Sequence, residues 1–344
     1  MRGPAGTDPA GAAGSGLPLG GTGLSCTDYA DFLAREYLAG YVRAGGAAVR
    51  FVVAGDEEVA GRWHRDLQRI AAAEGYLHVS VDAAETRVST IDQIYAEVAR
   101  AVDLTFLVRR TLQTAWEDVD RPPASLDEVT VAQVAEHNDD DVRECARSIR
   151  RQLESTLLRD SSMARDFRLA VLRLCQAELG NGEVSETERD AVLAWLRVEP
   201  VAMRALRSAS LYGRVGRHNA RAMLISLATW MLATAGSGLL IDLDLARVGV
   251  SRRPPVEARR GIYYSKAAVL DAYEVLRQLV DATDQLSGVL VAVTLPPELV
   301  SDEGRGLPAY SALHLRVVDE VRDRRRANPF AALVRLETRL EAVR

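Results

Sequence analysis

The sequence predicts an α/β fold whose mostly parallel sheet is split around a helical insertion. Short, β-branched apolar runs alternate with helical segments near both ends of the chain, and this alternation is typical of βαβ units. Between about residues 90 and 219 the periodicity is helical alone, with proline and glycine breaks between segments. We therefore place a helical insertion at residues 103–216.

Composition favours a protein of the cytoplasm. The 344 residues carry a net charge of −5, with 48% hydrophobic and 26% charged side chains, which is ordinary for a soluble domain with its own core. No apolar run approaches the ~18 residues of a membrane helix, so we expect no membrane contact. Cys26, Cys145 and Cys175 are widely separated, which argues against disulfides or a zinc ribbon and fits a reducing compartment.

The first sheet-forming part is expected at residues 25–102. Residues 1–24 are rich in Gly, Ala and Pro and lack the features of a signal peptide, so they are predicted to be a disordered tail. Thr27 and Asp28 can cap a helix that Gly45 and Gly46 end. The elements that follow are a strand at 47–54 ending in Gly55, a helix at 60–74, a strand at 76–82 and a helix at 91–102.

The same reading gives the rest of the chain. Inside the insertion the pattern predicts helices at 142–158, 164–179 and 186–198. The remainder of the α/β domain, residues 217–344, is expected to contain a helix at 220–235, a strand at 238–243, a helix at 266–286 and a strand at 288–294.

The turn after strand 47–54 lies where a P-loop NTPase binds phosphate. The signature G-x-x-x-x-G-K-[ST] works because glycines let backbone N–H groups surround the phosphates, the lysine reaches their oxygens and the hydroxyl holds magnesium. This chain fails the signature, and its one lysine, Lys266, lies far along the sequence. The turn reads Gly55, Asp56, Glu57, Glu58, Val59, Ala60, Gly61 and Arg62.

A longer series of segments, spread in order over residues 29–340, resembles the P-loop ATP-binding proteins of bacterial BREX-type phage-exclusion systems. That resemblance implies an AAA-like P-loop NTPase fold with helices on both faces of the sheet. The segments are residues 32–38, Gly45 and Gly46 before 49–53, 219–224 before 238–242, 273–279 with Asp281, 295–299 with Asp302 and Glu303, 305–307 with Tyr310, Ala312, Leu313 and Arg316, and 328–330 with 334–336.

The resemblance also implies that the phosphate loop is vestigial. With the family's first glycine on Ala54, the last glycine, the lysine and the hydroxyl residue fall on Val59, Ala60 and Gly61, so all three chemical roles are lost. Arg62, in the next turn of helix, is the one candidate to replace the lysine.

Three acids occupy this loop instead. Asp56, Glu57 and Glu58 put negative charge where phosphate needs donors. Since carboxylates are stabilised at helix N-termini, we expect one of them to accept hydrogen bonds from the following helix and to close the loop.

The family's second catalytic strand ends in Asp-Glu, with the aspartate supporting magnesium and the glutamate polarising water. Here Asp242 is followed by Leu243, and Asp244 comes two residues after Asp242. Both are interpreted as remnants of that motif. The resemblance further places a γ-phosphate-sensing position on Thr294.

Arg305 and Arg316 match basic positions that can act across a subunit boundary. Retained surface or ion-pair roles are the alternative for both arginines. No cation site is expected from the acidic run 138–141, which suits a helix cap, and the five histidines lack paired metal spacing.

The sequence therefore predicts a non-catalytic, pseudo-ATPase subunit of a phage-defence system, with no cofactor or metal expected. Its partner would be an intact P-loop relative, or a helicase or nuclease of the same system. One alternative is a divergent ATPase that uses ATP and Mg with Arg62, Asp242 and Asp244. Another is a DNA-binding adaptor that uses the insertion and the arginine clusters for weak, salt-sensitive contacts. Those clusters are Arg252 with Arg253, Arg259 with Arg260, and Arg322 with Arg324, Arg325 and Arg326.

Overall fold

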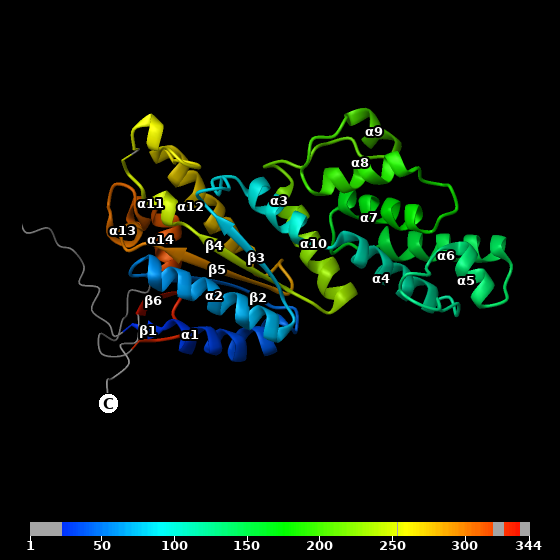
Figure 1. Cartoon of the computed structure of the whole chain (residues 1–344), viewed down its shortest axis with the longest axis horizontal. Coiled ribbons are helices and arrows are strands. Elements are labelled where there is room, and N and C mark those ends of the chain that lie inside the picture. Colours follow the sequence, from blue (N-terminus) through cyan, green and yellow to red (C-terminus); the bar gives the residue numbers. More distant parts are fainter. Residues whose placement is uncertain (1–22, 253, 319–326, 338–344) are drawn as a thin grey trace, which may run out of the picture.

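A computed structural model describes residues 23–252, 254–318 and 327–337. Its centre is a six-stranded, all-parallel sheet in the order β1-β6-β2-β5-β4-β3 (Figure 1). The predicted parallel α/β fold is confirmed. The strands are β1 (Leu24–Ser25), β2 (Ala47–Ala54), β3 (Leu77–Asp82), β4 (Leu239–Asp244), β5 (Val289–Leu295) and β6 (Leu333–Glu337).

The two faces of the sheet are covered by different helices. Along β2, Val52 packs on one face with α1 (Cys26–Leu33), the π-helix η1 (Ala34–Val42) and α2 (Glu57–Glu74). Phe51 points to the other face, which α3 (Ile91–Ala101), α10 (Ala220–Ala235) and α12 (Lys266–Asp281) cover. Both faces are buried, which explains why the central strands are continuous apolar runs.

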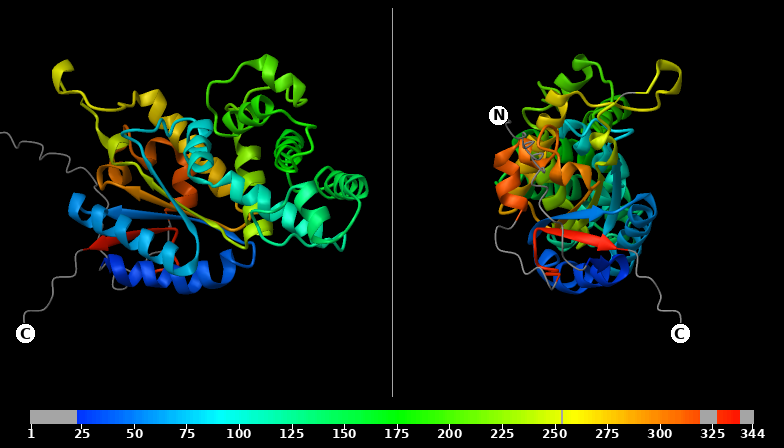
Figure 2. Two further views of the ribbon diagram at one scale, coloured as in Figure 1. Left: turned by 45° about the vertical axis from the view of Figure 1, so that its right-hand side comes forward. Right: turned by 90° about the vertical axis from the view of Figure 1, so that its left-hand side faces the viewer.

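Six helices follow α3 and extend away from the sheet (Figures 1 and 2). Their core includes the buried Trp116, Phe167 and Trp195. α10 joins this core to the sheet, because Trp230 donates to Thr111 Oγ1 at 2.9 Å and stacks edge-on against Phe167. The helices are α4 (Leu104–Glu117), α5 (Val131–His137), α6 (Val142–Leu157), α7 (Arg165–Glu178), α8 (Glu186–Leu196) and α9 (Met203–Ser208).

Short elements complete the carboxyl end of the sheet. They are α11 (Ala246–Gly249), η2 (Val256–Ala258), α13 (Glu298–Ser301), η3 (Leu307–Ala309) and α14 (Ser311–Val317).

No helix in the described ranges has both the length and the apolarity to cross a bilayer.

The beginning of the chain differs from its prediction. Residues 1–22 of the predicted tail lie outside the described residues, but Leu24 is part of β1, where it pairs with Leu336. The first helix is capped by Ser25, whose side chain accepts from Asp28 N–H, rather than by Thr27 or Asp28. A two-residue strand carries no periodicity, so this boundary had no pattern to reveal it.

Candidate functional site

Several of the predicted site residues lie at the carboxyl edge of the sheet. Because the strands are parallel, their carboxyl ends lie on the same edge, the usual ligand edge of α/β sheets. In the register, Val52 of β2 pairs with Thr294 of β5, which pairs with Asp244 of β4. β5 thus stands between the strand that leads into the turn and the strand that carries the two aspartates.

The turn between β2 and α2 is only two residues long. Gly55 and Asp56 separate Ala54, the last residue of β2, from Glu57, the first of α2. Asp56 caps the helix: its Oδ1 accepts from Val59 N–H at 2.9 Å. A protein carboxylate therefore uses an N–H group of the kind that a phosphate loop offers to a nucleotide.

The other residues of the predicted loop belong to α2. Glu57 and Glu58 are exposed in its first turn, whereas Val59 is buried. Arg62 Nη2 lies 3.4 Å from Glu58 Oε1, one helical turn away on the surface, a pair worth only a few tenths of a kcal/mol (about 0.3–0.5). Ala60 and Gly61 add no polar side chain.

Asp242 is buried and held by two histidines. His64 of α2 donates through Nδ1 to Asp242 at 2.7 and 2.8 Å. His64 Nε2 lies 3.4 Å from Asp244 Oδ2, and His78 Nε2 of β3 lies 3.4 Å from Asp242 Oδ2. The last two contacts lack hydrogen-bond geometry.

The pKa values of this cluster favour an ion pair. Burial would lower the pKa of His64, but the hydrogen bond to Asp242 and the nearby carboxylate of Asp244 raise it to about 10. Burial would raise the pKa of Asp242, but the hydrogen bond from His64 and the nearby imidazole of His78 lower it. An imidazolium therefore faces the carboxylate that would support magnesium in an ATPase.

The turn between β2 and α2 has two residues and contains no lysine, and the Asp242 carboxylate is hydrogen-bonded to His64. Within the described ranges, no group of three or more His, Cys, Asp or Glu side chains is arranged to hold a metal ion.

Thr294 lies beside the cluster at the end of β5. Its side chain is buried, and Oγ1 has no hydrogen-bond partner among the described residues. The predicted sensor position is thus placed at the same edge as Asp242 and Asp244. Its role stays a prediction.

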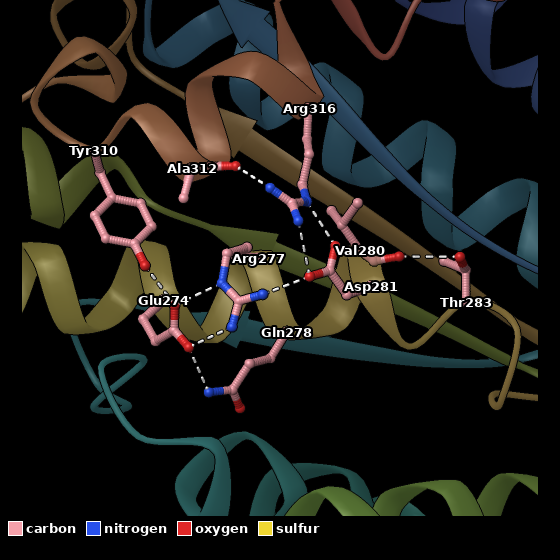
Figure 3. Close-up of polar contacts among 9 residues, drawn as sticks. All are labelled: Glu274, Arg277, Gln278, Val280, Asp281, Thr283, Tyr310, Ala312 and Arg316. Carbon is pink, nitrogen blue, oxygen red and sulfur yellow. Dashed lines mark hydrogen bonds and ion pairs between the residues drawn. The ribbon is translucent and has the colours of Figure 1, made fainter.

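Both predicted trans-acting arginines make contacts within the chain. Arg305 Nη2 donates to the carbonyls of Tyr264 at 2.8 Å and Val248 at 3.3 Å. Arg316 pairs with Asp281 at 2.6 Å and donates to the Ala312 carbonyl (Figure 3). An action across a subunit boundary would require these contacts to break.

Arg316 belongs to a polar network between α12 and the α14 segment (Figure 3). Arg277 bridges Glu274 and Asp281 on one face of α12, and Tyr310 donates to Glu274. The hydrogen bond from Arg277, followed by that from Tyr310, outweighs the effect of burial and lowers the pKa of Glu274 to about 2. This network ties two helices together.

His64 and His78 were missed by the sequence reasoning. Each is a lone histidine in its own element, and only the folded register brings them to Asp242: β3 pairs with β4 so that Ser80 faces Asp242, with His78 two residues earlier on the same face. The one signal in the sequence was that His64 comes four residues after Ala60. It therefore lies about one helical turn further along the same face of the predicted helix, near the turn that follows strand 47–54.

The fold and this edge define a parallel α/β protein consistent with the P-loop NTPase class. A family model described as BREX system ATP-binding protein BrxC/D matches residues 39–342, so the chain belongs to that family. No curated protein and no solved structure matches the chain.

Proposed function

We propose that this protein is a non-catalytic, pseudo-ATPase subunit of a BREX-type phage-defence system. The observation that carries the proposal is the ion pair between His64 and Asp242. In an ATPase of this class the aspartate supports magnesium. Here a cationic side chain of the protein itself neutralises it, so the carboxylate has no charge left to attract a metal.

The capped turn supports the same conclusion. Asp56 satisfies Val59 N–H, and exposed Glu57 and Glu58 add negative charge at the helix N-terminus. Nucleotide phosphate would lose a donor and meet like charges. ATP and magnesium are therefore not cofactors of this chain in the proposal.

A subunit without turnover acts through partners. We propose an intact P-loop relative of the same system, or its helicase or nuclease, as the partner. Co-expression of the chain with such a relative should give a complex that co-elutes in size-exclusion chromatography. Separate elution at micromolar concentration would count against this partner.

The test of the catalytic status compares the wild type with Asp242→Asn. We expect no ATP turnover above background in either protein, and no rise in melting temperature with Mg-ATP. A ligand at ~100 times its Kd would add ~2.7 kcal/mol, so the shift is a sensitive measure. A Mg-dependent rate in the wild type that Asp242→Asn removes would establish the divergent ATPase instead.

A restored variant tests why nucleotide is excluded. Val59→Gly, Ala60→Lys and Gly61→Thr, combined with Asp56→Asn, Glu57→Gln and Glu58→Gln, return the family pattern. His64→Ala is then added to free Asp242. Calorimetry should detect ATP binding only when both changes are present, and binding without His64→Ala would mean that the ion pair is not the block.

A further inference from the structure

An exposed loop rich in arginine projects from the molecule between α11 and α12 (Figure 2, yellow). We call residues 250–261 the arginine loop. Its tip, from Pro255 to Arg260, is exposed without interruption. Around it, from residue 245 to 266, the sequence has one acid, Glu257, against the basic residues Arg247, Arg252, Arg253, Arg259, Arg260 and Lys266. This segment is therefore locally basic in a chain of net charge −5.

The exposed arginines of this loop are available to an anion. Among the described residues, no carboxylate lies within ion-pair distance of Arg252, Arg259 or Arg260. Arg259 and Arg260 donate only to backbone carbonyls of the loop, such as that of Pro254 at 3.1 Å. Arg147 and Arg150 on helix α6, by contrast, have acidic partners.

The base of the loop is fixed to the sheet edge. Gly261 has φ +66° and lies so close to Ala84 that a Cβ would be 2.2 Å from the Ala84 carbonyl oxygen. Ile262 N–H donates to that oxygen at 2.7 Å. Tyr264 O–H contacts the Ala83 and Thr86 carbonyls at 3.0 and 2.8 Å. The supporting turn carries exposed side chains of both signs, Glu85 and Arg87.

Arg305 holds the two ends of the loop together. Its Nη2 donates to Val248, just before the loop, and to Tyr264, just after it. Arg247 lies over the ring of Tyr263 at 4.6 Å and adds a second link between the same two ends. A loop with its ends fixed loses less conformational entropy when it binds.

We propose that the arginine loop binds the phosphate backbone of duplex DNA without sequence preference, and that Arg305 is its positioning residue. Guanidinium groups suit phosphate because they offer paired N–H donors. Single-strand binders also need aromatic platforms for the bases. Of the two aromatic rings at the base of the loop, that of Tyr264 is buried and that of Tyr263 is covered by Arg247. The inference is independent of ATP turnover, so it stands or falls apart from the proposed pseudo-ATPase function.

The test measures anisotropy of a labelled 30-base-pair duplex of mixed sequence with the full chain at about 50 mM salt. The variant Arg252→Gln/Arg259→Gln/Arg260→Gln should bind about tenfold or more weakly, and the slope of log K against log salt should fall by about 3, near 0.9 for each lost phosphate contact. The matched control, Arg143→Gln/Arg151→Gln/Arg207→Gln, removes equal charge from exposed sites on the insertion and should bind as the wild type does.

Several outcomes overturn the proposal. Unchanged binding by the loop variant, or no binding by the wild type, would remove the loop as a DNA site. Loss of binding in the control alone would assign DNA contact to the helical insertion. If single-stranded DNA competes more strongly than unlabelled duplex does, the duplex is excluded as the preferred ligand. If polyglutamate competes as strongly as unlabelled duplex does, the result would indicate an acidic protein partner.

Arg305 has its own readout. Arg305→Gln should weaken DNA binding while leaving the salt slope unchanged, because the phosphate contacts remain but the loop is no longer held. Trypsin should then cleave the native protein faster after Arg252, Arg259 or Arg260, and Arg305→Lys should restore part of both effects. DNA binding and cleavage equal to those of the wild type in Arg305→Gln would refute the positioning role.

Discussion

At the scale of single residues, the centre of the site is the charge pair of His64 and Asp242. Asp242 is fully enclosed, and a buried carboxylate requires a partner. His64 supplies it from α2, while Asp244 lies 3.4 Å from His64 and His78 lies 3.4 Å from Asp242. The pair therefore has a structural function even in the absence of catalysis.

The first prediction concerns the titration of His64. We expect its imidazole to titrate near pH 10 in the folded protein, measured by NMR of labelled histidine, against 6.5 for an ordinary histidine. Because the pKa is raised on folding, its stabilising effect is complete below about pH 6.5 and disappears as the pH rises through 10. A midpoint near 6.5 would contradict the ion pair.

The second prediction concerns stability. His64→Leu should lower the free energy of unfolding by about 3 kcal/mol, the low end for breaking a buried pair, because His78 still faces Asp242. Adding Asp242→Asn should recover part of the loss by removing the unpaired charge. The exposed control His218→Ala should change stability by less than about 0.5 kcal/mol. Denaturant titration measures all three.

At the scale of elements, many of the strands and helices could be predicted from the sequence, but the elements that lie beside them in space could not. Strand β2 and helix α10 have the predicted bounds, because Gly46 and Gly55 flank the strand and Gly236 ends the helix. Helices α4, α5 and α9 and strand β6 were not predicted. β6 is only partly buried and alternates polar with apolar residues, so it lacks the strong signal of the central strands.

The candidate site was likewise predictable only in part. The turn and Asp242 could be found from sequence, because both follow apolar strands. The length of the turn could not: the sequence predicted a helix from Ala60, but Asp56 caps the helix, so α2 begins at Glu57. Local capping chemistry decided the geometry that the family pattern left open.

The third prediction tests this cap. Asp56→Ala should destabilise the protein by about 1 kcal/mol, within the 0.5–2 kcal/mol range for lost caps. Glu57→Ala is the matched control: it removes an exposed carboxylate from the same turn without removing the hydrogen bond to Val59 N–H. Thermal unfolding of both variants measures the two losses of stability. Equal losses would attribute the effect to the charge at the helix end rather than to the cap.

At the scale of the whole molecule, one helix serves two cores. α10 packs on the sheet and also on the insertion through Trp230, Phe167 and Thr111. The predicted division of the chain into sheet and insertion describes its sequence order. The packing is more continuous, because a single apolar cluster runs from α3 through α10 into α7.

The fourth prediction concerns the beginning of the chain. A protein lacking residues 1–22 should keep the wild-type melting temperature, because that stretch has too few apolar residues to add to the core. Removing residues 1–26 should lower it, since the β1 pairing with β6 and the Ser25 cap are lost as well. Equal melting temperatures for the two truncations would show that β1 contributes nothing.

The strand order has a consequence for synthesis on the ribosome. β2 emerges early, but both of its neighbours, β5 and β6, are translated only after the whole insertion. The nascent chain must therefore carry an unpaired, strongly apolar strand while the helices of the insertion, which depend on local contacts, already fold. During that interval β2 is the segment most exposed to aggregation, and a chaperone that protects this protein should bind there.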